Sequence, residues 1–400
     1  MNPLISNGEA LDRILAHLPA IPKIHCPLTK CAGRILAEDI CADRPFPPFD
    51  RAMMDGYAIR YDDIAEIDQF EIGGEALAGH PQTGLHAEIG SAIEVMTGAV
   101  VPNGADCIVP YEATERIGDT HFRLTDLEDT AKGDCIHPCG SDHKAGQTLL
   151  RAGCVLGSRE IAVAATCGYT DLSVSKLPCI AIASTGDELV PVTATPAAHQ
   201  IRRSNDLAID TALARRQLHA QERTHLPDDA DACLAHLREL VANNTFILIS
   251  GGISMGKKDF IPETLNQLGL HCYFHGVAQR PGKPMGFWAN DSCAVFALPG
   301  NPLSTLTCLH HYAIPAIEHA MGRKQGPRQQ TVELTAPAIG REKICVFLPV
   351  QLLPDNQAKP SPARNSGDLS GILESDGYIL IPAGTSTAET GARFAFHPWL

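Results

Sequence analysis

The sequence predicts a multidomain α/β protein whose central part is a doubly wound parallel sheet. Three observations support this class. The chain has 400 residues, two to three times a common domain size of about 150, so more than one domain is expected. Buried-strand patterns alternate with helical patterns between about residues 176 and 322. Shorter β-like segments occupy the chain on either side of this region.

A short amphipathic helix is predicted at the start of the chain. Ser6 and Glu9 have the spacing of a capping box, and the apolar residues that follow share one helical face. From about 45 to 133 the apolar runs are short and broken by Gly, Pro and Asp, which predicts a small inserted β-rich domain. A helix over 159–168 and a strand over 172–174 are expected next.

The central region contains three candidate buried strands, each a short apolar run that ends in a glycine-containing loop. They cover residues 179–183, 246–249 and 294–298. A stripe of apolar residues over 230–241 predicts a helix between the first two. After Gly326 the pattern becomes short and alternating up to the last residue, which predicts a second β domain.

Composition and charge limit the classes of function. The chain is 44% hydrophobic and 20% charged with no long apolar run, as in a globular protein and unlike a disordered or membrane-spanning one. Its net charge of −14 argues against nucleic acid or an anionic membrane as the main partner. An anionic ligand must therefore meet a local concentration of basic side chains.

The first residues and the cysteines bear on the cellular compartment. No basic segment followed by an apolar core opens the chain, so we expect no signal peptide and a cytoplasmic protein. The 14 cysteines are scattered singly, which predicts reduced and mostly buried thiols.

Three loops follow the predicted strands, over residues 184–188, 250–256 and 298–304. In an open α/β sheet such loops meet at the carboxyl edge, where backbone amides can bind anions. The glycines of 250–256 leave room for a phosphate or another oxyanion to approach the backbone closely. Each loop alone is more typical of a simple turn, but three in one sheet favour a binding site.

Charges of both signs stand near these loops. Arg280 and Lys283 lie in a proline-stiffened segment that holds two basic side chains at a fixed separation. Asp187, Glu188 and Asp259 supply carboxylates, the usual ligands of Mg²⁺ beside a phosphate. The alternative is that Asp187 and Glu188 only cap the segment that follows them.

A zinc site is a further, disfavoured hypothesis. Cys135, His137, Cys139 and His143 have cysteine and histidine at short spacing. No second cysteine pair of the usual spacing lies nearby, and Pro138 restricts the turn.

Seven motifs then occur in order along the chain: FDRAMMDGYA, TGAVVPNGADCIV, GSDHKAG, STGDELV, SGGISMGKKDF, RPGKPMGFW and VFALPGNPLS. Together they resemble the molybdopterin molybdenumtransferase (MoeA) family, which includes the gephyrin E domain. The resemblance covers nearly the whole chain, and the order and separation of the motifs make it specific.

The resemblance implies a subunit of four domains and a homodimer whose sites combine the inserted domain of one subunit with the α/β domain of the other. The implied domains are an elongated, helix-containing domain I over 1–45 together with 134–175, an inserted β-rich domain II over 46–133, a MogA-like molybdopterin-binding α/β domain III over 176–325, and a C-terminal β-barrel domain IV over 326–400.

The resemblance also implies a reaction. The enzyme would take adenylylated molybdopterin and molybdate as substrates, release AMP with the help of Mg²⁺, and leave molybdenum on the dithiolene. A molybdopterin-adenylylating protein and molybdoenzyme apoproteins are the implied partners. The implied catalytic residues are Asp55, Thr97, Glu188, Asp228, Asp259 and Lys283. The implied metal ligands are Asp187, Glu188 and Asp259. The implied cofactor-binding residues are Thr185, Gly186, Ser250, Gly251, Gly252, Ser254, Arg280, Pro299, Gly300, Asn301, Pro302, Ser304 and Arg364.

Two departures from the family pattern leave other functions open. Arg203 stands where the family commonly has an acidic residue, and Pro349 stands where an oxyanion-binding arginine is expected. We expect Arg364 to replace that arginine. The alternatives to a molybdenum insertase are a non-catalytic molybdopterin-binding or scaffolding relative and an enzyme that inserts tungstate.

Overall fold

The computed structural model describes residues 4–126, 130–253, 260–324, 326, 329–361 and 365–399. The chain divides into two compact units, each of which is described by itself. Unit 1 contains residues 1–38, 152–161 and 171–400, and unit 2 contains residues 39–151 and 162–170. The finer division into four domains stays a prediction.

Unit 2 is built mainly of strands, as expected for the inserted segment. Its main sheet has six strands in the order β7-β4-β6-β5-β9-β8. Their bounds are β4 Gly56–Ile59, β5 Gln69–Ala76, β6 Ser91–Val95, β7 Cys107–Pro110, β8 Thr114–Ile117 and β9 His121–Leu124. Two short pairs complete the strands of this unit: β2 Ile40–Cys41 with β11 Thr148–Leu150, and β3 Arg51–Ala52 with β10 Ile136–His137. Two 3₁₀ turns, η2 Tyr61–Ala65 and η3 Tyr111–Ala113, connect strands of the main sheet. The helix α2, Ser158–Thr166, contains residues of both units.

The centre of unit 1 is a six-stranded sheet in the order β16-β13-β17-β21-β20-β18. Its strands are β13 Ile180–Thr185, β16 Ala220–Leu226, β17 Phe246–Ser250, β18 His271–His275, β20 Gly286–Ala289 and β21 Ala294–Leu298. The three strands predicted from apolar runs are β13, β17 and β21, which are parallel neighbours. The sheet differs from a fully parallel one because β18 and β20 continue it in antiparallel pairing.

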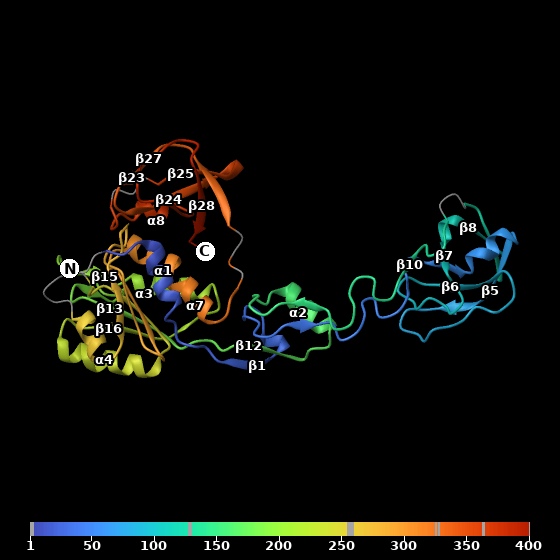
Figure 1. Cartoon of the computed structure of the whole chain (residues 1–400), viewed down its shortest axis with the longest axis horizontal. Coiled ribbons are helices and arrows are strands. Elements are labelled where there is room, and N and C mark those ends of the chain that lie inside the picture. Colours follow the sequence, from blue (N-terminus) through green and yellow to red (C-terminus); the bar gives the residue numbers. More distant parts are fainter. Residues whose placement is uncertain are drawn as a thin grey trace. The chain divides into compact units, whose positions relative to one another are not determined.

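Helices cover both faces of this sheet, which is why its central strands are apolar on both sides. Ile182, Leu248 and Phe296 belong to one core cluster, together with residues of α3 (Asn205–Ala214) and α7 (Ile314–Ala320). The alternating residues, such as Ala183 and Ile249, belong to the other cluster, with α4 (Ala230–Asn243) and α5 (Ile261–Gln267). Figure 1 shows α4 beside β16 and β13. The doubly wound arrangement predicted from the sequence is therefore confirmed.

The predicted N-terminal helix is α1, Asn7–Leu15. The Ser6 hydroxyl accepts a hydrogen bond from the Glu9 amide at 3.1 Å, as the capping-box spacing requires. Ile14 is fully buried against the core that contains α7, and α1 lies beside α7 in Figure 1. Two further strands of unit 1, β1 Lys23–Pro27 and β12 Asp171–Ser175, form an antiparallel pair although they are far apart in the sequence. The short turn η1, Leu28–Lys30, follows β1.

The C-terminal part of unit 1 is a closed five-stranded barrel. Its order is β24-β25-β22-β28-β26, and β24 also pairs with β26, which closes the ring. The strands are β22 Gln330–Leu334, β24 Cys345–Leu353, β25 Gln357–Pro360, β26 Gly377–Ile381 and β28 Arg393–Pro398. Beside them are the pair β23 Ala338–Arg341 and β27 Thr385–Ala388, the turn η5 Pro354–Asn356 and the one-turn helix α8 Ser370–Leu373. This barrel confirms the second β domain expected after Gly326.

Three further features complete the fold. Between α6 (Pro302–Cys308) and α7 one turn is a π-helix, η4 (Leu309–Ala313). All 14 cysteines lie within the described residues and all are free thiols, eight of them buried, as expected from their spacing. Among the described helices, none is both long enough and apolar enough to cross a membrane.

Candidate functional site

A cavity of about 680 Å³ opens at the carboxyl ends of the parallel strands of unit 1. Its walls come from the segments that follow β13, β17 and β21, together with Asp228, which follows β16. This is the edge at which open α/β sheets bind ligands, because successive loops present backbone amides there. The three loops singled out in the sequence therefore meet at one site.

The turn after β17 requires glycine at two successive positions. Gly251 and Gly252 have φ of +95° and +64°, a region that favours glycine. A Cβ on Gly251 would lie 2.8 Å from the Thr185 carbonyl oxygen, and one on Gly252 would lie 2.8 Å from the Thr185 hydroxyl. The missing side chains keep this turn narrow and leave its backbone accessible from the cavity.

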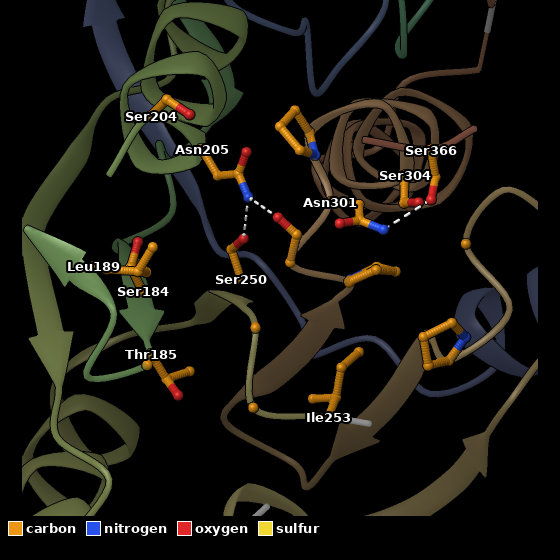
Figure 2. A pocket seen from close by; sticks show the side chains of 18 of the residues that line it. Ser184, Thr185, Leu189, Ser204, Asn205, Ser250, Ile253, Asn301, Ser304 and Ser366 are labelled. Atoms are coloured by element: carbon orange, nitrogen blue, oxygen red, sulfur yellow. Dashed lines mark hydrogen bonds between the residues drawn. The ribbon is translucent and has the colours of Figure 1, made fainter. Parts of the chain in front are cut away.

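Asn205 ties two of the loops together. Its side-chain amide donates to the Ser250 hydroxyl at 2.8 Å and to the Gly300 carbonyl at 2.7 Å (Figure 2). One side chain at the start of α3 therefore fixes the ends of β17 and β21 relative to each other. Asn205 was not among the predicted site residues, because its role depends on contacts with loops that are distant in sequence.

Ser184 opens the predicted loop 184–188 but was not among the predicted binding residues. It lines the cavity, it is 1% exposed, and its hydroxyl has no hydrogen-bond partner among the described residues. A buried hydroxyl without a partner costs free energy, about 1–3 kcal/mol. A polar ligand in the cavity would supply the missing partner.

The loop after β21 is held by its own polar side chains. The Thr305 hydroxyl donates to the Pro299 carbonyl at 2.6 Å and to the Asn301 carbonyl at 3.1 Å. The Asn301 amide donates to the Ser366 hydroxyl at 2.8 Å (Figure 2), so a segment of the barrel part also borders the cavity. Ser304 lines the cavity and is 3% exposed.

Arg280 and Lys283 are exposed side chains at the rim of the same cavity. The loop between them turns around the buried Gln279, which accepts a hydrogen bond from the Tyr312 hydroxyl and donates to the Gly282 carbonyl at 3.3 Å. A Cβ on Gly282 would lie 2.5 Å from the Cys308 sulfur, so the loop packs closely on α6. The backbone that carries the two cations is therefore held in place by Gln279 and by α6.

The carboxylates lie at this same carboxyl edge, Asp187 and Glu188 after β13 and Asp228 after β16. Asp187 and Asp228 bond reciprocally: each amide donates to the other side chain, at 3.4 and 3.3 Å. Glu188 and Asp228 line the cavity, whereas Asp187 does not. Within the described part of the chain, no group of three histidine, cysteine or acidic side chains is arranged to hold a metal ion, at these carboxylates or near Cys135.

Not every residue singled out in the sequence is described at this cavity. Ser254, Asp259 and Arg364 lie outside the described residues and stay predictions. Pro349 is buried in β24 and does not line the described cavity.

Asp55 and Thr97 belong to unit 2 and contact each other. The backbone amide and the hydroxyl of Thr97 both donate to Oδ1 of Asp55, at 2.6 and 2.7 Å. These two donors, first the amide and then the hydroxyl, hold the pKa of the Asp55 carboxyl below its ordinary value. Asp55 is therefore an exposed, ionised carboxylate in a fixed position.

The fold and the cavity define a class: a doubly wound α/β protein with a C-terminal barrel and a cavity lined by basic side chains at the sheet edge. The chain belongs to the MoeA family. The regions described as "MoeA N-terminal region (domain I and II)", "Probable molybdopterin binding domain" and "MoeA C-terminal region (domain IV)" match residues 5–168, 181–319 and 332–399.

Individual relatives agree with this assignment. A molybdopterin molybdenumtransferase of Synechocystis is 35% identical over 403 residues, which cover 99% of this chain and all of that protein. One from Staphylococcus aureus (strain Mu50) is 32% identical, over 78% of this chain and 75% of its own. A crystal structure of a molybdopterin biosynthesis MoeA protein from Pyrococcus horikoshii OT3 has a TM-score of 0.84 at 25% identity, over 99% of this chain and 100% of that one.

Proposed function

We propose that this protein is a molybdopterin molybdenumtransferase, which inserts molybdate into adenylylated molybdopterin with metal-dependent release of AMP. The observation that carries the proposal is the charge of the cavity. Four basic side chains and two carboxylates of the described residues line it, in a chain whose net charge is −14. Such a local excess of positive charge suits a ligand that carries phosphate and meets an oxyanion.

Different cavity residues would bind different parts of the substrates. The narrow turn at Gly251 and Gly252 lets an oxyanion approach backbone amides, and the Ser184 hydroxyl can hydrogen-bond a polar group of the pterin. Arg280 and Lys283 attract molybdate and stabilise negative charge on its oxygens. Because their loop is fixed by Gln279, little reorganisation is needed when charge develops during the reaction.

The residues present suit Mg²⁺ in kind, although they form no complete site by themselves. Glu188 and Asp228 offer hard oxygen ligands, and Asp187 lies against Asp228. Mg²⁺ commonly takes one or two protein carboxylates and completes its coordination with water and substrate phosphate. When bound, the ion would neutralise charge on the phosphate that leaves as AMP. The contribution of Asp259 to this set stays a prediction.

The proposed active form of the protein is a homodimer. In a homodimer, the fixed carboxylate of Asp55 and the Thr97 hydroxyl would complete the cavity of the other subunit. The protein would act in the cytoplasm, receive its substrate from a molybdopterin-adenylylating protein and pass its product to molybdoenzyme apoproteins. Tungstate, with nearly the same size and charge as molybdate, would fit the same contacts.

A non-catalytic molybdopterin-binding relative is the second candidate. It is favoured by Pro349, which replaces an expected arginine in a buried position of β24. Binding without insertion would follow if no other cation took the place of that arginine.

Complementation of a bacterium that lacks its molybdenum insertase tests the proposal. The wild-type gene should restore the activity of a molybdoenzyme, whereas Lys283→Ala should not. Lys359→Ala serves as the matched control, because Lys359 is exposed on β25 and does not line the cavity. Failure of a well-expressed wild-type protein to complement would favour the non-catalytic candidate.

A further inference from the structure

Arg203 lies where β15 (Ile201–Arg202) meets α3. Its amide donates to the Val190 carbonyl at 2.9 Å, which continues the pairing of β15 with β14 (Leu189–Val190). Two residues further on, Asn205 is fixed by the Ser250 and Gly300 hydrogen bonds. The backbone of Arg203 is therefore held on both sides, next to the loops that form the cavity.

The side chain of Arg203 is held as well. Its Nε lies 3.0 Å from Oδ2 of Asp206, whose side chain is only 5% exposed. A buried carboxylate requires a partner, so this ion pair restricts the position of the guanidinium. Within the described residues, the terminal nitrogens of Arg203 make no hydrogen bond, and the side chain lines the cavity.

The neighbouring Arg202 differs from Arg203 in its contacts. Its Nε donates to the carbonyls of Val192 and Ala194, both at 3.1 Å, so Arg202 braces the loop that precedes it. Both side chains line the cavity, and neither makes a hydrogen bond through its terminal nitrogens among the described residues. Arg203 differs because its Nε binds a buried carboxylate, Asp206, which holds the guanidinium while its terminal donors stay available to a ligand. These donors lie in a plane that matches two oxygens of a phosphate.

We propose that Arg203 is a substrate-binding residue that recognises the phosphate of the pterin substrate. This inference rests on the proposed function, since it assigns one group of that substrate to one residue of the cavity. Arg203 lies two residues before Asn205, which links Ser250, next to the Gly251–Gly252 turn, to Gly300. Because that turn suits an oxyanion, the position of Arg203 favours the phosphate over the pterin ring. Asp206 is then a positioning residue, which acts through Arg203.

The test compares two fluorescent oxidised pterins derived from molybdopterin, one with the phosphate and one after its enzymatic removal. Wild-type protein should bind the phosphorylated pterin more tightly. Arg203→Gln should weaken that binding about tenfold, as expected for one charge-assisted contact, and should leave the dephosphorylated pterin unchanged. Arg215→Gln is the matched control, because Arg215 is exposed at the end of the same helix and does not line the cavity. Its two affinities should equal those of the wild type.

A structural role would give a different result. Arg203→Gln leaves the Asp206 carboxylate buried without its cation. A double variant, Arg203→Gln with Asp206→Asn, is therefore measured as well, because it restores a neutral hydrogen-bonded contact. The double variant should fold like the wild type and still lose the preference for the phosphorylated pterin. If it keeps that preference, Arg203 only neutralises Asp206 and the assignment is wrong. Wild-type protein that binds neither pterin would contradict the proposed function, and this assignment with it.

Discussion

Asp55 shows how two donors on one oxygen fix the charge of an exposed group. Replacing Thr97 by Val removes the hydroxyl donor and keeps the backbone amide, the larger of the two causes. We therefore expect the pKa of Asp55 to rise part of the way toward its ordinary value. Carbon-13 NMR of the Asp55 carboxyl over a pH titration measures this change. An unchanged pKa in Thr97→Val would mean that the hydroxyl contributes nothing.

The two hydrogen bonds of Asn205 predict that this residue contributes to the thermal stability of the protein. Asn205→Ala removes two hydrogen bonds and leaves the Ser250 hydroxyl, in a residue that is 2% exposed, without this donor. The expected loss is about 1–2 kcal/mol, or a fall in Tm of about 2–8 °C. Calorimetric thermal unfolding measures it. Asn301→Ala, which removes one hydrogen bond at an exposed residue, should lower the Tm less. Equal effects of the two variants would contradict the bridging role.

The individual residues of the site were only partly predictable. Loop glycines and the cations of 280–283 could be identified because their local sequence already restricts the backbone or concentrates charge. Ser184, Asn205 and Arg203 could not be assigned their contacts, since those contacts depend on a strand end or a buried carboxylate that the local sequence does not specify.

At the scale of elements, apolar runs predicted β13, β17 and β21 because helices cover both faces of these strands. The antiparallel pairing of β18 and β20 was not predicted, since a short buried strand carries no signal for its direction. Nor did the sequence distinguish the π-helical turn η4 from the α-helices α6 and α7 that flank it.

The η4 turn packs histidines against the barrel, which predicts a dependence of stability on pH. Burial, and secondarily Arg216, lowers the pKa of His310 to about 4; burial, and secondarily His397, lowers that of His311 to about 3. The Tyr378 hydroxyl of β26 lies 3.2 Å from Nδ1 of His311. Both histidines are therefore neutral in the folded protein at neutral pH.

In the unfolded chain these histidines titrate near a pKa of about 6.5. Between pH 6.5 and about 4 the unfolded state therefore binds more protons than the folded state, and the free energy of unfolding decreases as the pH falls. His310→Gln should make the fall in Tm over this range less steep. Thermal unfolding at a series of pH values measures the slope, and parallel curves for the two proteins would contradict the assignment.

At the scale of the whole molecule, the proposed homodimer predicts complementation between inactive subunits. Asp55→Ala and Lys283→Ala should each abolish molybdenum insertion. In mixed dimers one site carries both defects and the other carries neither, so random mixing should restore about a quarter of the wild-type activity. Co-expression of the two variants followed by an insertion assay measures it. A mixture as inactive as its components would contradict a site shared between subunits.

The proposed function requires that the cavity of unit 1 supports molybdenum insertion. The most direct measurement supplies purified protein with adenylylated molybdopterin, molybdate and Mg²⁺, and follows both AMP release and the activity of a reconstituted apo-molybdoenzyme. We predict both signals for the wild type and the loss of reconstitution in Lys283→Ala. A folded wild-type protein that binds the pterin substrate and yet produces neither signal would contradict the account.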